Sequence, residues 1–214
     1  MKFLNLSIIA IAVFCKIANA QGHIVPLQKK FNQDMPVADL EKLRSSGSEE
    51  ITAFVKSKEP DEIWGTFRGL RWGQSLPEDK KESFIEIENK GKMLGYSKND
   101  DQLKIGDAEL SSIEYVFYEN MFSFVIIQGD TKSNYDALLK ALDARYGKHI
   151  KDNEFIEEYK WLFDKKTEEE VVLINLKLNQ FSDKFTLFIG NVKLNLILGI
   201  DDKIAAKKGA KSDF

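Results

Sequence analysis

Cysteine and histidine are almost missing from this sequence of 214 residues, which has one cysteine, Cys15, and two histidines, His23 and His149. A single thiol forms no disulfide within the chain and is too few for a cysteine zinc site. Catalytic zinc usually takes two or three imidazole ligands, and the two histidines here are far apart in sequence. We therefore expect no disulfide, no metal site and no other cofactor.

Other features are scarce as well. With only 13 glycines and 4 prolines, the chain is not a collagen or a low-complexity polymer. The 31 Lys and Arg residues are balanced by 34 Asp and Glu residues, and the formal net charge of −3 gives no basic surface for nucleic acid. The sequence has no phosphate-binding glycine loop and no Gly-x-Ser-x-Gly nucleophile elbow. Hydrophobic residues nevertheless make up 43% of the chain, enough for a folded core.

The first twenty residues have the three parts of a secretory signal peptide. Lys2 gives a short positive start, Leu6 to Phe14 is apolar, and Ala18-Asn19-Ala20 is a small-residue cleavage site. A transmembrane anchor is the competing interpretation, but Lys16 breaks the run, which is shorter than the roughly 20 apolar residues that a bilayer core requires. The protein is therefore predicted to be periplasmic or secreted, with no integral membrane span after cleavage.

Residues 21–60 are predicted to form a polar leader and two short helices. Asp34 and Pro36 are typical of a helix start. Apolar residues with helical spacing follow, namely Val37, Leu40 and Leu43 in the first helix and Ile51, Phe54 and Val55 in the second. We expect both helices to cover a sheet.

The clearest hairpin and the clearest helix of the chain follow one another. Ile113 to Phe117 alternates in polarity, Glu119-Asn120 suits a tight turn, and Met121 to Gln128 continues as an apolar strand. A helix is then predicted from Ser133 to Tyr146, with Gly147 after its end. Ser133 and Asp136 suit a capped start, and the apolar face comprises Tyr135, Leu138, Leu139, Leu142 and Tyr146.

Further strands are predicted beyond Gly147. Their apolar residues are Tyr159, Trp161 and Phe163, then Val172 to Leu178, then Phe185 to Ile189, then Val192 to Leu198. Polar residues alternate with them, which indicates a sheet with one face in water. The polar stretches Lys165 to Glu170 and Asn179 to Lys184 are short enough for hairpin connections.

Strands in succession around one main helix, without repeated βαβ units, predict an α+β fold. We expect a mostly antiparallel sheet packed against that helix, with short N-terminal helices. Residues 61–200 are predicted to form a single domain, after a signal peptide at 1–20 and a leader with short helices at 21–60. Residues 201–214 are predicted to be a flexible Lys-rich tail.

One stretch, Phe67 to Glu78, has a distinctive order of strand, Trp72-Gly73 and helix start. Gly73 suits a positive φ at a sharp turn, and Ser75 and Glu78 have the spacing of a capping box. The stretch resembles the opening of a loosely defined family of uncharacterised exported bacterial proteins, whose domains begin with Phe-Arg-Gly-hydrophobic-x-Trp-Gly. The resemblance continues through Leu103 to Leu110, the hairpin and the main helix. It implies a fold and an envelope location, and no activity.

The same stretch supplies the candidate binding residues Arg68, Arg71 and Trp72. In an extended strand Arg68 and Trp72 share a face, and an arginine beside an indole suits a carboxylate or a sugar. The alternative is architectural, with Trp72 in the core and the arginines paired with nearby acids. No residue is predicted to be catalytic.

Carboxylates are numerous, and paired-acid catalysis is left open because the separation of two acids is not visible in a sequence. Asp100, Asp101, Asp201 and Asp202 are interpreted as solvated turn residues. We therefore predict an exported, non-catalytic binding or scaffold protein. Its expected partner is another envelope protein or a small anionic or sugar ligand. The alternative is an acid-based hydrolase acting on envelope glycan or peptide.

We predict that the exported protein begins at Gln21, because the Ala-Asn-Ala site directs cleavage after Ala20. Intact mass and N-terminal sequencing of exported protein measure this directly. A retained Met1, or a lipid mass on Cys15, would contradict the prediction.

Overall fold

The structure is a computed structural model. It describes residues 36–45, 66–151, 153–164, 171–191, 198–201, 203–205 and 207–208. Several predicted features lie outside the described residues: the signal peptide, most of the leader, the second short helix, the connection at 165–170 and the strand residues 192–197.

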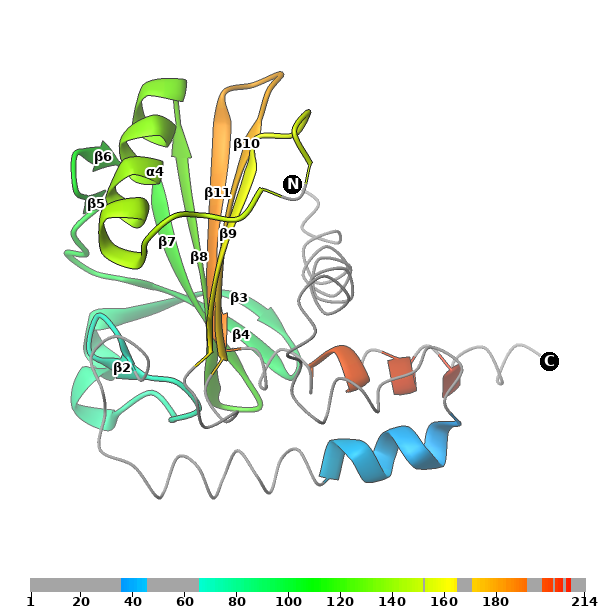
Figure 1. Cartoon of the computed structure of the whole chain (residues 1–214). Coiled ribbons are helices and arrows are strands. Elements are labelled where there is room, and N and C mark those ends of the chain that lie inside the picture. The colour runs from blue at the N-terminus through cyan, green and yellow to red at the C-terminus, as the bar shows by residue number, and fades with distance from the viewer. Residues whose placement is uncertain are drawn as a thin grey trace.

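A seven-stranded antiparallel sheet forms the centre of the protein (Figure 1). Its strand order is β3-β4-β7-β8-β11-β10-β9. The strands are β3 (Phe84–Lys90), β4 (Met93–Lys98), β7 (Ser112–Tyr118), β8 (Met121–Asp130), β9 (Glu158–Asp164), β10 (Val171–Asn179) and β11 (Lys184–Asn191). With few helices beside this sheet, the predicted α+β class with a mostly antiparallel sheet is confirmed.

Short elements complete the described chain. They are β1 (Thr66–Phe67), β2 (Leu70–Arg71), the 3₁₀ helix η1 (Glu78–Ser83), β5 (Lys104–Ile105), β6 (Ala108–Glu109) and α4 (Lys132–Tyr146). Residues 37–45 are helical, as are 198–201, 203–205 and 207–208. The predicted capping box is wrong, because η1 begins after Pro77 without a side-chain cap.

The hairpin of β7 and β8 forms where it was predicted. Tyr118 pairs with Met121, and the two residues between them, Glu119 and Asn120, have φ values of 47° and 65°. Two consecutive positive φ values match the right-handed twist of the flanking strands, which is why tight hairpins use them. The turn conformation also sets the direction in which the Glu119 side chain leaves the backbone.

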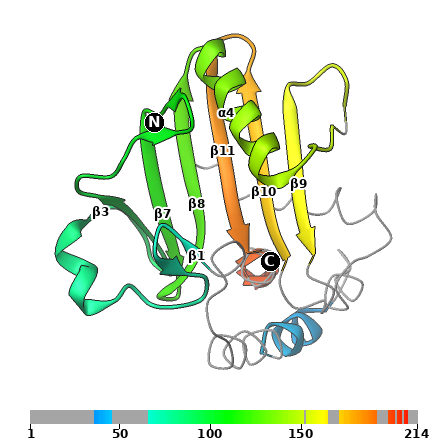
Figure 2. The ribbon, with the colours of Figure 1, turned by 60° about the vertical axis from the view of Figure 1, so that its left-hand side comes forward.

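Helix α4 carries the chain from the middle of the sheet to its far edge. Strand β8 leads into α4, and the chain then enters edge strand β9, from which β10 and β11 return until β11 pairs with β8 (Figure 2). The start of α4 is capped by Thr131, whose side chain accepts a hydrogen bond from the Asn134 amide, instead of by Ser133. Gly147 ends the helix with φ 82°, as predicted.

The buried face of α4 consists of Tyr135, Leu138 and Leu142. The Tyr135 ring lies 6.0 Å from the Phe185 ring of β11 and 6.2 Å from the Tyr159 ring of β9, measured between centroids. Leu139, which was expected on this face, is only partly buried at its edge.

A second, smaller core joins the two ends of the described chain. Leu40 and Leu43 of the helix at 37–45 pack with Ile200 and Ile204. The expected strand that ends at Leu198 and the expected tail therefore differ from the structure, because Leu198 and the described residues after it are helical. Ile200 and Ile204 are four residues apart, the spacing that places two side chains on one helix face.

We predict that Leu138→Ala lowers the free energy of unfolding by about 2 to 5 kcal/mol, because Leu138 is fully buried. Urea denaturation measures the change. Lys140→Ala, on the exposed side of α4, is the matched control and is expected to stay within about 0.5 kcal/mol of wild type. Equal midpoints for wild type and Leu138→Ala would contradict this packing.

Candidate functional site

The predicted binding residues Arg68, Arg71 and Trp72 do not lie along one extended strand. Thr66–Phe67 and Leu70–Arg71 pair as a tight hairpin, and Arg68 and Gly69 form its turn with φ values of 48° and 78°. The expectation that Arg68 and Trp72 share a strand face is therefore wrong. The positive φ predicted for Gly73 is confirmed at 79°.

Arg68 and Trp72 are both engaged inside the protein. The Arg68 guanidinium pairs with Asp101, whose other carboxylate oxygen accepts a hydrogen bond from Tyr115 Oη at 2.7 Å. The Asp101 side chain is only 8% exposed, so it is not a solvated turn residue. The Trp72 indole is 3% exposed and stacks on Phe122 at 4.5 Å. These contacts favour the architectural interpretation of the motif.

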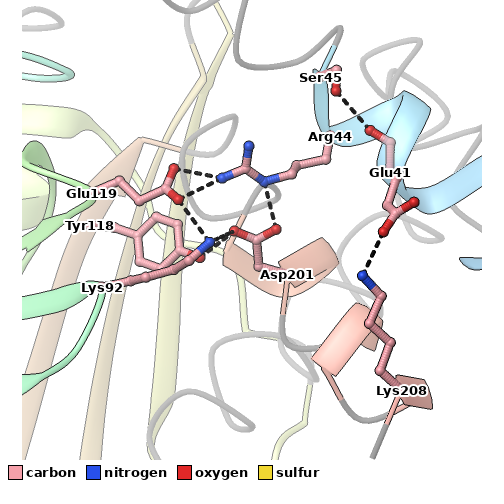
Figure 3. Close-up of polar contacts among 8 residues, drawn as sticks. All are labelled: Glu41, Arg44, Ser45, Lys92, Tyr118, Glu119, Asp201 and Lys208. Atoms are coloured by element: carbon pink, nitrogen blue, oxygen red, sulfur yellow. Dashed lines mark hydrogen bonds and ion pairs between the residues drawn. The ribbon is translucent and has the colours of Figure 1, made fainter. Parts of the chain in front are cut away.

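Asp201 is the centre of a polar network that links distant parts of the chain (Figure 3). Arg44 donates from Nε to Asp201 at 2.7 Å and from Nη2 to both oxygens of Glu119 at 2.7 and 2.6 Å. Lys92 Nζ lies 2.8 Å from Glu119 and 3.2 Å from Asp201, and the Tyr118 hydroxyl donates to Asp201. We call Arg44, Lys92, Tyr118, Glu119 and Asp201 the Asp201 network.

The electrostatics of the Asp201 network follow from these contacts. Burial raises the pKa of Asp201, but the hydrogen bonds from Arg44, Tyr118 and Lys92 outweigh it and hold the pKa below its ordinary value of 3.8. Burial and the Asp201 carboxylate both raise the pKa of Tyr118. The bond to Glu119 raises the pKa of Lys92, and the bond to Asp201 raises that of Arg44. At neutral pH the network therefore holds two cations and two anions.

A group with equal numbers of cations and anions suits a structural link between segments of the chain better than a catalytic centre. It ties the helix at 37–45 and the helical residue Asp201 to the β7–β8 turn, in which Glu119 has its positive φ. The prediction that Asp201 is a solvated turn residue is wrong, because its side chain is 13% exposed. Its partners are far away in sequence, and no local pattern marks them.

Two acids, Glu88 of β3 and Glu114 of β7, lie on the strands that flank β4. An added Cβ at Gly95 of β4 would lie 2.4 Å from Oε1 of Glu114 and 3.3 Å from Cβ of Glu88. Gly95 therefore leaves room for the Glu114 carboxyl. Burial raises the pKa of Glu114, and the nearby Glu88 raises it further, against the opposing effect of Lys90.

Two exposed phenylalanines lie at one end of the sheet, in the segment before β9 and in the β10–β11 turn. Phe155 is 82% exposed, Phe181 is 102% exposed, and Ile156 beside Phe155 is 39% exposed. Gln180 Nε2 donates to the Phe155 carbonyl at 3.4 Å, which joins the two loops. We call Phe155, Ile156 and Phe181 the aromatic tip. From the sequence, Phe181 was expected within the polar connection Asn179 to Lys184, and no pattern there indicated that its ring would be exposed.

No family model matches the sequence, and comparisons with curated proteins and with solved structures find no significant match. The resemblance of Phe67 to Glu78 to exported bacterial proteins therefore stays a prediction. In the described part of the chain, no helix is long and apolar enough to cross a bilayer. Nor do the described residues contain a group of three or more side chains suited to a metal ion.

We predict that Asp201→Asn lowers the free energy of unfolding at pH 7 by about 1 to 3 kcal/mol, because charged hydrogen bonds are lost. The folded pKa of Asp201 is lowered, so this contribution is complete above the ordinary pKa of 3.8 and is lost as the pH falls below it. Urea titrations from pH 7 to pH 3 should therefore show the curves of wild type and variant converging in acid.

Glu41→Gln is the matched control for Asp201→Asn. Glu41 pairs with Lys208 at 2.7 Å between the same two helical regions, but both side chains are about half exposed. We expect this variant to lose only about 0 to 1 kcal/mol. A constant gap between wild type and Asp201→Asn at every pH would contradict the lowered pKa.

Proposed function

We propose that this protein is an exported, non-catalytic binding or scaffold protein of the bacterial envelope. The observation that carries the proposal is the aromatic tip, because large apolar side chains displayed together on a surface mark interaction sites. In this proposal the sheet supports the tip, with α4 as its one main helix and the short terminal helices at the opposite end.

The distribution of charge supports a binding role over a catalytic one. Arg68 is paired with Asp101, and the Asp201 network balances its own cations and anions. Both sets join distant segments of the chain and so contribute to the fold. The aromatic tip, in contrast, exposes apolar surface to water without contributing to the buried core.

Export and the family resemblance are part of the same proposal. The Ala18-Asn19-Ala20 site supports delivery to the periplasm or the exterior. The Phe67 to Glu78 motif supports kinship with exported bacterial proteins. Under this proposal the partner is an envelope component that accepts an apolar surface, in place of the small anionic or sugar ligand first considered for Arg68.

We predict that substitution of the aromatic tip abolishes retention on envelopes. Purified exported protein is mixed with a washed envelope fraction containing membranes and their proteins, and the pelleted share is measured. Phe155→Ser/Phe181→Ser should lose most of the retention shown by wild type. Ile85→Ser is the control, because Ile85 is an exposed apolar residue on edge strand β3. Unchanged retention of the double variant, at unchanged melting temperature, would sink the proposal.

The second candidate function is acid-based hydrolysis of envelope glycan or peptide. The observation in its favour is the raised pKa of Glu114 beside Glu88, since a general acid must keep its proton near neutral pH. Hydrolysis of peptidoglycan fragments by wild type, and its loss in a folded Glu114→Gln protein, would establish this function in place of the first.

A further inference from the structure

The two phenylalanines of the aromatic tip are the most exposed large apolar side chains among the described residues. Neither ring has a polar group that could form a hydrogen bond with water, a sugar or a peptide. They come from two separate loops, and Figures 1 and 2 place these loops at the same end of the sheet. The helix at 37–45 and the helical residues from 198 onward lie toward the opposite end in Figure 1, and the Asp201 network joins them to the β7–β8 turn.

Hydrogen bonds fix the shape of both loops. The Phe155 amide donates to the Asn153 side chain at 2.9 Å, and the Phe181 amide donates to the Asn179 side chain at 3.0 Å. Such side-chain turns hold the backbone in one conformation. The Leu178 amide also donates to the Glu157 carbonyl at 2.9 Å, which joins the strand before one loop to the end of the other. The backbone of the tip is therefore preorganised, and the high exposure of Phe155 and Phe181 means that both rings project into solvent.

Charged residues of both signs surround the aromatic tip. Glu154, Asp183 and Lys184 are exposed in the same two loops or directly after them. Behind them, Lys151 pairs with Glu157 at 3.6 Å and Lys177 pairs with Glu158 at 3.5 Å. This collar has no excess of positive charge and therefore no means of attracting an anionic surface. Mixed charges suit a surface that itself carries both signs.

We propose that the aromatic tip docks on the surface of a lipid bilayer, with Phe155 and Phe181 entering the boundary between headgroups and acyl chains. The inference rests on the proposed binding function and names its partner. Two rings that project from separate loops need pockets of matching shape on a protein, whereas a fluid bilayer opens around them. Zwitterionic headgroups match the mixed charges of the collar, and binding depends on buried apolar area.

The test uses protein-free vesicles of phosphatidylcholine, alone or mixed with phosphatidylglycerol. Sedimentation measures the partition coefficient of exported wild-type protein, of Phe155→Ser, of Phe181→Ser and of the double variant. We expect each single substitution to weaken partition about tenfold, as removal of a buried phenyl ring does. Phe181→Trp should retain binding. Phosphatidylglycerol and added salt should change the wild-type value less than twofold, about the level of a weak surface charge effect.

Ile85→Ser is again the control, and all variants share one N-terminus, so any contribution from that end is equal throughout. Absence of wild-type binding, or equal partition of the double variant, would overturn the lipid assignment. Binding that requires phosphatidylglycerol would overturn it too. If wild-type protein does not bind vesicles, but envelopes retain wild type and do not retain the double variant, the tip binds a protein. The proposed function then survives. A dimer in sedimentation velocity that Phe181→Ser dissociates would instead assign the tip to self-association.

Discussion

The pairing of β8 with β11 is the interaction on which the rest of the structure depends. It joins the strands that precede α4 to the strands that follow it, although the paired residues are more than fifty positions apart. Gly129 pairs with Phe185, and an added Cβ at Gly129 would lie 2.2 Å from the Phe185 ring. Only glycine leaves room for that ring, which reaches across β8 toward Tyr135 of α4. The register of the sheet and the position of the helix are thus set together.

The two ends of the sheet differ in role. At one end the charged side chains of the Asp201 network hold terminal segments against the β7–β8 turn. At the other end the β10–β11 turn and the segment before β9 display the aromatic tip. Partial burial and ion pairing explain the charged side chains at the first end. The exposed rings at the second end add no buried surface to the folded state, and this is the reason for proposing a partner that covers them.

The regular parts of this fold were predictable because periodicity is local. Alternation identified β7 through β11 in outline, and the helical spacing of Tyr135, Leu138 and Leu142 identified the buried face of α4. The turn at Arg68 was missed because the strands on either side of it have two residues each, too few to show an alternation of polar and apolar residues. Asp201 was missed because its exposure depends on Arg44, Lys92 and Tyr118, which only the tertiary structure brings near. Phe181 was missed because a single aromatic residue in a turn has the same sequence signal whether buried or exposed.

Immersion of Phe181 in lipid is the most direct measurement of the central claim. A polarity-sensitive dye is attached to Phe181→Cys in one protein and to Ile85→Cys in another, both with Cys15 replaced by serine. With phosphatidylcholine vesicles, we predict that the emission from position 181 shifts to the blue and becomes inaccessible to aqueous quenchers, while emission from position 85 is unchanged. The same emission at position 181 with and without vesicles would contradict the claim.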